Sequence, residues 1–538
     1  MPDPQTDDDG PPLTSNARLA ALVAALAVVG AAQVMLLPTN PDASWYLYMA
    51  ARVLDGARPY RDIVETNPPL ILILNMGVVT LARWSGASAL IVFPTLLLGL
   101  IAVSLALTWT LSRGLPASLR QVSLVAWTYL LLVNPGVTFG QREHLLLALI
   151  LPYAHASAAA ARGDRPPRGP VLAAGLLAGV GFALKPFFLP AAAAVEVYLA
   201  TRRGRRVWLR PEALAMGAVF VAYAAVVAVW TPQYVPMARA YAPLYRHHGP
   251  MGPALLASSW RLPLIVAGVA AAWSVARRRT PGWAEVFGLL ALGLTAGVYL
   301  TGKGWPYHWL PAVSIGAALA CGAGALATLR LSPALRRAAA AVGLGVVAPA
   351  LGGLSLLSTA AAWRDESPFR MARDDVGPGQ ALLVLSPWVH RAFPLVNETG
   401  VAWGMRHPMV WPIAAFYADG SYRPGTYRPL AAMSAPEREF VGEVAHDFAQ
   451  SRPALLLIDD DPPRPTLPGF DYLRYFAADP RFAHALAGYE PLTRTIHFRV
   501  YRRKESRRGA RSAPDGRPAR QKGTTTFPAP PGTPGGPG

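Results

Sequence analysis

Hydrophobic residues in this chain fall into long runs that short polar segments separate. Many runs approach the roughly 20 residues that an α-helix needs to cross a bilayer. A segment in lipid must satisfy its own backbone polar groups, so each such run favours a helix. The pattern predicts a polytopic α-helical membrane protein. The runs are 19–37, 88–111, 121–139, 144–161, 171–184, 187–200, 212–230, 261–276, 284–301, 308–328 and 338–360.

Arginine-rich loops set the predicted orientation, because positively charged loops favour the cytoplasmic side. If all of these loops are cytoplasmic, successive loops alternate between the two sides of the membrane only when the short apolar run 69–82 does not cross it. About eleven crossings result, with the N-terminus inside and residue 361 outside. The runs 171–184 and 187–200 are short for crossings. The arginine-rich loops lie at 113–120, 162–168, 202–206, 277–279 and 330–337.

The two ends of the chain differ in composition from the apolar region. Residues 1–16 are polar and acidic, and 504–538 are rich in Arg, Gly and Pro, so we expect both to be disordered. The run 19–37 is too long for the core of a signal peptide and has no small-residue cleavage site, so we interpret it as an uncleaved first crossing. Residues 17–360 then form a transmembrane domain.

Residues 361–503 have the pattern of a small α/β domain outside the membrane. The short apolar runs 380–386 and 453–459 predict buried strands, and 498–502 alternates like a strand. Helical spacing over 436–451 lies between them.

Composition narrows the class further. The 538 residues are 53% hydrophobic and only 15% charged, whereas soluble domains carry about 25% charge. This excludes a soluble enzyme and a coiled coil. The single cysteine, Cys321, excludes a disulfide framework. The net charge of +19 lies partly in the basic tail and largely in short loops. There it sets orientation, so we expect a membrane partner and no nucleic acid.

The first outer loop, 38–87, gathers acidic residues at the membrane surface. Asp42 lies near the start of a helix predicted over 42–55, with Tyr46 one turn later, and Asp62 and Glu65 follow. A carboxylate there is suited to take a proton from an acceptor hydroxyl. The alternative is that Asp42 is only the N-cap of an amphipathic helix.

Other ionisable residues lie at the remaining outer turns. Each has a plainer alternative, namely interfacial capping, an internal ion pair or snorkelling. The Gly-Lys-Gly string around Lys303 lacks the Ser or Thr of a phosphate-binding P-loop, so nucleotide hydrolysis is rejected. Their common placement on one face favours a single site built from several loops. These residues are Arg142, Glu143, His144, Lys185, Lys303 and His308.

These motifs resemble the GT-C class of polyprenyl-phosphate-dependent glycosyltransferases, in particular the protein O-mannosyltransferase and lipid A aminoarabinose transferase group. That group has an acidic residue in its first outer loop, an aromatic residue a few positions later and an acid before Pro-Pro-Leu. Asp42, Tyr46 and Glu65 before Pro68-Pro69-Leu70 match this pattern. Position 43 is Ala where the group has a second acid.

Two further strings extend the resemblance, which covers roughly residues 17–330. Arg142-Glu143 falls where the group has an arginine followed by an acid, and Lys185-Pro186 is similar to its Thr-Lys-Gly-Pro motif. The resemblance implies transfer of a sugar from a polyprenyl phosphate, with inversion, on the outer face of the bacterial inner membrane.

Physical chemistry assigns roles to the matching residues. A departing lipid phosphate needs cationic stabilisation, for which Lys185 and Arg142 are candidates. Asp42 is the candidate base, and Glu65 is the second catalytic candidate, expected to orient Asp42 or bind acceptor hydroxyls. We expect the remaining polar residues to orient the base or bind the acceptor, which is a lipid, glycan or protein. No cofactor is assigned, and a requirement for a divalent cation stays open. These supporting residues are Tyr46, Asp62, Glu143, His144, Lys303 and His308.

The rival classes are a lipid-linked sugar flippase or transporter and a polymerase or ligase of surface polysaccharide. A transporter would have polar or broken segments at mid-depth and a repeat relating two halves. The sequence shows neither feature, and its polar residues gather at one face.

Overall fold

The computed structural model describes residues 12–249, 252–277, 279–328, 367–377, 379–463 and 467–504. The predicted crossing over 338–360 and the tail 505–538 lie outside these residues, as does most of the N-terminal segment. By their internal contacts, the residues divide into two compact units. The first comprises 1–39, 94–230 and 250–363, and the second 40–93, 231–249 and 364–538.

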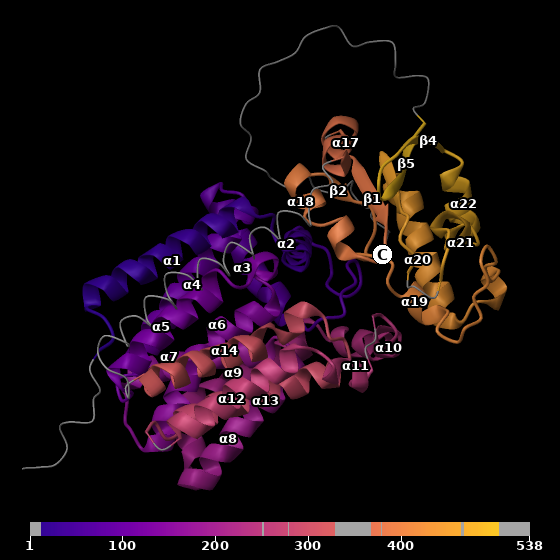
Figure 1. Cartoon of the computed structure of the whole chain (residues 1–538). Coiled ribbons are helices and arrows are strands. Elements are labelled where there is room, and N and C mark those ends of the chain that lie inside the picture. The colour runs from indigo at the N-terminus through magenta and orange to yellow at the C-terminus, as the bar shows by residue number, and fades with distance from the viewer. Residues whose placement is uncertain are drawn as a thin grey trace, which may run out of the picture. The chain divides into compact units, whose positions relative to one another are not determined.

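The first unit is helical (Figure 1). Its longer helices coincide with the predicted apolar runs, although α5 ends at Leu132, before Pro135 and a 3₁₀ turn, and so is shorter than its run. The helices are α1 (Asn16–Leu36), α4 (Ala89–Leu111), α5 (Ala117–Leu132), α6 (Arg142–Arg162), α7 (Arg168–Ala183), α8 (Leu189–Arg203), α9 (Pro211–Trp230), α11 (Pro253–Ala257), α12 (Arg261–Ala276), α13 (Trp283–Thr301) and α14 (Pro306–Thr328), with 3₁₀ turns η1 (Gly136–Thr138), η2 (Pro186–Phe188) and η3 (Arg205–Leu209).

Six helices of the described residues are long and apolar enough to cross a membrane: α1, α4, α6, α9, α13 and α14. The apolar helices α3, α7 and α12 are shorter. The chain is thus a polytopic helical membrane protein, and the count of about eleven crossings stays a prediction.

Helix α6 is the core of the first unit. In an apolar stretch of 18 residues within α6, 94% of the stretch is buried, against 11% for the corresponding stretch of α9. Helix α6 packs against α7, α8, α13 and α14. Small residues allow close approach elsewhere: Gly268 of α12 faces the backbone of Gly316 in α14, where a Cβ has no room. The first residues of α6 are therefore held in a fixed, buried position.

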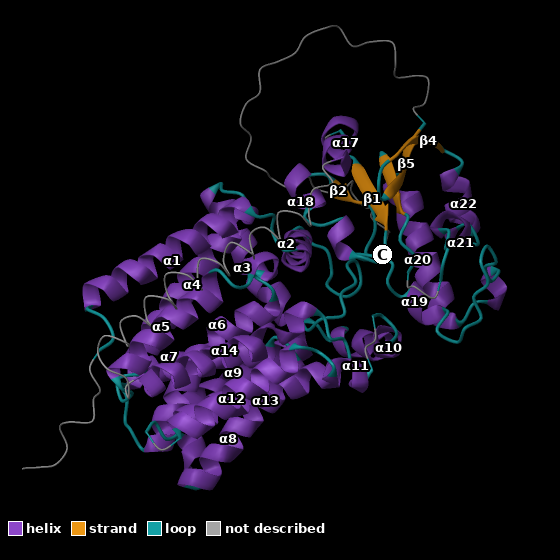
Figure 2. Cartoon of the chain, viewed as in Figure 1, coloured by secondary structure: helices purple, strands orange, loops and turns teal. Residues whose placement is uncertain are grey.

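The second unit contains a five-stranded sheet of order β2-β1-β3-β5-β4 (Figure 2). β1 pairs in parallel with β2 and β3, while β5 runs antiparallel to β3 and β4. The strands are β1 (Ala381–Leu385), β2 (Ala402–Trp403), β3 (Leu455–Asp459), β4 (Tyr489–Arg494) and β5 (Phe498–Arg503).

The predicted α/β character of this region is confirmed. All residues of β1 and β3 are buried, as their apolar runs predict, and α20 connects β2 to β3. The edge strand β4 contains Pro491 and a register shift. The hydrophobic pattern did not predict this strand, because edge strands tolerate proline and polar residues.

Helices from both early loops and the C-terminal region belong to the second unit. The predicted boundary at residue 360 lies outside the described residues, yet this unit also includes 40–93 and 231–249. The helices are α2 (Pro41–Leu54), α3 (Leu70–Ser85), α10 (Tyr234–Arg246), α17 (Ser367–Asp375), α18 (Leu395–Thr399), α19 (Ile413–Phe416), α20 (Ala435–Ser451), α21 (Tyr472–Phe476) and α22 (Pro480–Leu486), with 3₁₀ turns η5 (Val389–Arg391) and η6 (Leu430–Ala432).

Candidate active site

The predicted site residues form two groups, one in each unit. The first outer loop provides the acidic group in the second unit, which is Asp42, Tyr46, Asp62 and Glu65. The outer turns of the helical unit provide the cationic group, which is Arg142, Glu143, His144, Lys185, Lys303 and His308.

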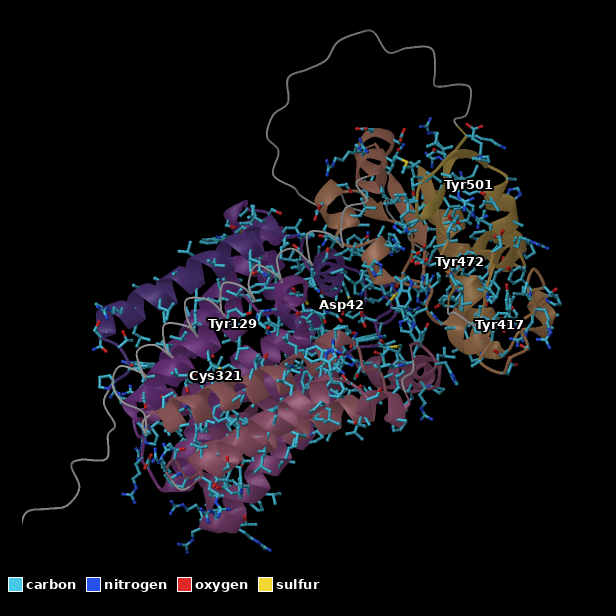
Figure 3. All side chains as sticks on the ribbon, viewed as in Figure 1. Asp42, Tyr129, Cys321, Tyr417, Tyr472 and Tyr501 are labelled. Atoms are coloured by element: carbon cyan, nitrogen blue, oxygen red, sulfur yellow. The ribbon has the colours of Figure 1, made fainter. Side chains whose placement is uncertain are left out.

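Asp42 lies in the first turn of α2 and is partly exposed (Figure 3). Asn40 is the N-cap: its side-chain oxygen accepts hydrogen bonds from the backbone N–H groups of Asp42, at 3.0 Å, and Ala43, at 3.3 Å. The alternative that Asp42 caps this helix is therefore wrong.

Glu65 is a positioning residue for the outer loop. Its buried carboxylate accepts hydrogen bonds from Trp45 Nε1 at 2.7 Å and from the backbone and side-chain N–H groups of Asn67, at 2.9 and 2.5 Å. The Asn67 side chain also donates to the Tyr46 hydroxyl at 3.0 Å. Glu65 and Tyr46 thus fix the loop around residue 67 on α2, and Glu65 acts through these contacts.

Asp62 has a local partner. Its carboxylate accepts two hydrogen bonds of 2.9 Å from the Arg58 guanidinium and one from the Arg58 backbone. The Arg58 guanidinium lowers the pKa of Asp62. Both side chains are largely exposed, so this pair closes a surface turn.

Residues far along the chain fasten α2 within the second unit. Asn397 donates to the Ser44 carbonyl at 2.7 Å, and the backbone N–H of Trp403 donates to the Tyr48 hydroxyl at 3.2 Å. Asn397 begins the string Asn397-Glu398-Thr399, which has the form of a glycosylation sequon. Its burial and its contact with α2 give it a structural role instead, which no local pattern could indicate.

A buried ionic cluster is formed by residues at helix ends and turns of the helical unit. Lys185, between α7 and η2, donates to Glu143 Oε1 at 2.5 Å, and His308 Nε2 in α14 lies 3.7 Å from the same oxygen. Arg142 interacts electrostatically with Glu143, and Lys303 with His308. We call Arg142, Glu143, Lys185, Lys303 and His308 the cationic cluster.

The charge of the cationic cluster is net positive. Three cationic side chains accompany one carboxylate, and all five residues are buried. Burial lowers the pKa of Lys303, in the turn before α14, to about 8. Three cationic side chains gathered around one carboxylate offer charge-assisted hydrogen bonds, which suit an anion such as a phosphate.

A small cavity of about 20 Å³ adjoins the cationic cluster. Glu143, Lys185 and His308 are among its lining residues. Glu143 Oε2 and His308 Nδ1 are buried and make no hydrogen bond within the described part of the chain. The volume suffices for about one water, which would satisfy these atoms. The Tyr307 ring centroid, 5.6 Å from Lys185 Nζ, adds an aromatic contact that no motif indicated.

His144 is held by the backbone on both sides of its ring. Nδ1 accepts a hydrogen bond from the Gly140 N–H at 3.0 Å, and Nε2 lies 2.8 Å from the Leu131 carbonyl, to which it must then donate. The side chain is fully buried. This arrangement leaves neither nitrogen for an acceptor, so His144 stabilises the turn that leads into α6.

The described residues contain no group of three or more His, Cys, Asp or Glu side chains arranged for a metal ion. In the outer loop, Asp62 and Glu65 are already engaged by Arg58, Trp45 and Asn67. The residues present therefore do not fit a preformed divalent-cation site, and no step is assigned to one.

The fold is that of a polytopic membrane protein that has a buried ionic cluster in its helical unit and a small α/β domain. No family model and no curated protein matches the sequence. The structure is similar to ArnT from Cupriavidus metallidurans bound to undecaprenyl phosphate, with a TM-score of 0.57 and 14% identity over 91% of this chain and 98% of that chain.

The same enzyme in the apo state gives a TM-score of 0.54 at 14% identity, over 90% of this chain and 97% of that one. The chain therefore shares the fold of ArnT across nearly its whole length.

Proposed function

We propose that this protein is an integral membrane glycosyltransferase that moves a sugar from a polyprenyl-phosphate donor to an acceptor hydroxyl. In the proposed topology it lies in the bacterial inner membrane, with the N-terminus in the cytoplasm and the reaction on the outer face. The cationic cluster carries the proposal, because it is a buried, net-positive site in a fold shared with a protein solved with undecaprenyl phosphate.

Lys185 and Arg142 are assigned the role of binding the phosphate of the donor. A sugar on a polyprenyl phosphate already has a good leaving group, so the departing phosphate needs charge stabilisation more than a general acid. Glu143 holds Lys185 in place through their ion pair. Lys303 and His308 also interact electrostatically with this cluster, and Lys303 adds a further positive charge.

Asp42 is assigned the role of the general base that takes the proton of the acceptor hydroxyl. As the acceptor oxygen attacks the anomeric carbon, its proton passes to the Asp42 carboxylate. The anomeric carbon–oxygen bond breaks, and its electron pair leaves with the polyprenyl phosphate. Attack opposite the leaving group inverts the anomeric centre. Glu65 and Tyr46 position the loop that carries the base.

The decisive experiment incubates the purified full-length protein with polyprenyl phosphate carrying a radiolabelled sugar, together with a bacterial envelope fraction as acceptor. The expected result is free polyprenyl phosphate and label in the acceptor fraction. Movement of intact donor across a proteoliposome membrane without bond cleavage would instead identify a flippase and refute the proposal.

A further inference from the structure

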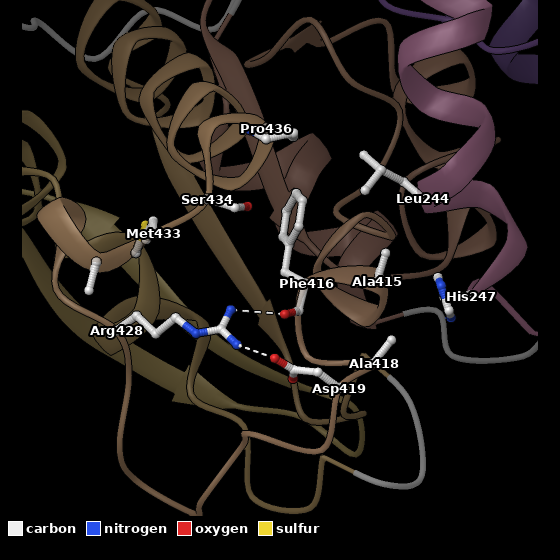
Figure 4. A pocket seen from close by; sticks show the side chains of 11 residues that line it. Leu244, His247, Ala415, Phe416, Ala418, Asp419, Arg428, Met433, Ser434 and Pro436 are labelled. Carbon is white, nitrogen blue, oxygen red and sulfur yellow. Dashed lines mark hydrogen bonds and ion pairs between the residues drawn. The ribbon is translucent and has the colours of Figure 1, made fainter.

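A pocket of about 690 Å³ lies within the second unit, away from every motif used above (Figure 4). It is formed by the C-terminal end of α10, the segment from α19 to Asp419, Arg428, and the start of α20. Its volume is within the range of small-molecule sites, about 300–1,000 Å³.

The polar wall of this pocket is held in a fixed geometry. Arg428 donates to the Phe416 carbonyl at 2.9 Å and to Asp419 at 3.1 Å, as Figure 4 shows. It also donates to the buried Glu437 at 3.0 Å, and its guanidinium lies 4.6 Å from the Tyr417 ring centroid. A preorganised wall lowers the entropic cost of binding a ligand.

The rest of the pocket combines apolar surface with hydroxyl and imidazole groups. The half-buried Leu244 of α10 provides apolar surface, and the buried Phe416 and Met433 lie behind it in the pocket wall. Ser434 and His247 add polar groups at the edge. The ligand is therefore expected to present both an apolar face and several hydrogen-bonding groups.

Charge distinguishes this pocket from the cationic cluster. The only formal charges among its lining residues are those of Arg428 and Asp419, which neutralise each other. Glu437 behind Arg428 adds a second carboxylate. An anionic lipid phosphate gains nothing here, because the one cation already has two carboxylate partners.

We propose that this pocket binds a neutral sugar unit of the acceptor, an inference that rests on the proposed function for its biological meaning. A pyranose ring has an apolar C–H face that can pack on Leu244. Its hydroxyls can donate to the Asp419 carboxylate and accept from Ser434. The pocket thus gives the protein a second, donor-independent contact with a glycan acceptor.

The test measures binding of methyl glycosides of mannose, galactose, glucose and N-acetylglucosamine to the full-length protein in nanodiscs, by saturation-transfer NMR without donor. Asp419→Ala removes an exposed carboxylate, and Leu244→Trp fills the pocket from a half-exposed helix position. Asp419→Ala should weaken binding of the preferred glycoside about tenfold, the effect of losing one hydrogen bond to a charged group. Leu244→Trp should weaken it at least as much, because the indole takes the space of the ligand.

Matched controls lie outside the pocket on the same kind of surface. Val235→Trp places the same bulk on α10, and Glu490→Ala removes an exposed carboxylate from β4. Both should bind as the unmodified protein does. Thermal unfolding of all four variants identifies any that fail to fold.

Two results would overturn the inference: no glycoside binds, or binding survives both pocket substitutions. Displacement of the glycoside signal by short neutral peptides at lower concentration would reassign the pocket to a protein acceptor. The outcomes remain separable from the proposed function. If the protein transfers sugar but binds no glycoside, only the proposed role of the pocket is refuted. If it binds glycoside but transfers no sugar, only the proposed glycosyltransferase activity is refuted.

Discussion

The ammonium group of Lys185 donates a hydrogen bond of 2.5 Å to Oε1 of Glu143, 42 residues earlier in the chain. Both side chains are nearly inaccessible, with 9% and 1% exposure. Desolvation makes such a buried pair a weak source of stability. Its value is that it holds a cation in one place, beside Arg142, where a phosphate is proposed to bind.

Lys185→Met should weaken donor binding by about 2–5 kcal/mol, the range for losing one partner of a buried charge pair. The methionine keeps the apolar stem but deletes the charge. It also leaves Glu143 buried without its cation, so stability should fall as well.

The double variant Lys185→Met/Glu143→Gln separates these two effects. It should recover thermal stability without recovering donor affinity, as measured by binding of labelled polyprenyl phosphate. Normal donor affinity in either folded variant would show that Lys185 does not hold the phosphate.

Asp42→Asn should lower the transfer rate by about 10²–10⁴-fold, the usual contribution of a general base. Donor affinity and unfolding temperature should not change, because Asn40 caps α2. Single-turnover transfer and donor binding are measured on the same preparation. Asp62→Asn, in the exposed pair with Arg58, is the matched control and should retain activity. Full turnover by the Asp42 variant would exclude it as the base.

The lowered pKa of Lys303 predicts that donor binding depends on pH. Burial lowers its pKa to about 8, so the side chain is charged below this pH and neutral above it. A donor phosphodiester keeps its charge over the same range. Donor affinity should therefore fall as pH rises from 7 to 9.

Two substitutions identify Lys303 as the source of that fall. Lys303→Arg should remove it, because arginine stays charged, and Lys303→Met should bind weakly at every pH. An affinity that stays constant from pH 7 to 9 in the unmodified protein would contradict this role.

The topology prediction places residues 38–87 outside the membrane. A cysteine at Ser85, which is exposed at the end of α3, should react in intact cells with a membrane-impermeant maleimide. The background is Cys321→Ser, which removes the single native cysteine. Thr201→Cys, beside the arginine-rich end of α8, should react only after permeabilisation. The reverse labelling pattern would mean that α3 crosses the membrane.

The sequence by itself determined the class of fold. The runs 88–111 and 144–161 became α4 and α6 because a helix satisfies its backbone locally and its apolar length is visible in any window. The apolar runs of β1 and β3 were equally visible, since strands buried on both faces are continuously hydrophobic. The residue types of the cationic cluster were also evident, because charges at the ends of apolar runs are rare.

Only the tertiary structure decided how those residues are used. Glu143 was expected to orient the base or bind the acceptor, and in the structure its carboxylate accepts a hydrogen bond from Lys185. Glu65 was expected beside the base, yet Trp45 and Asn67 occupy its carboxylate. His144, assigned to the acceptor, has both nitrogens engaged by the backbone. The physical reason is that side-chain pairing depends on which helices and loops pack together, and periodicity carries no information about contacts between distant segments.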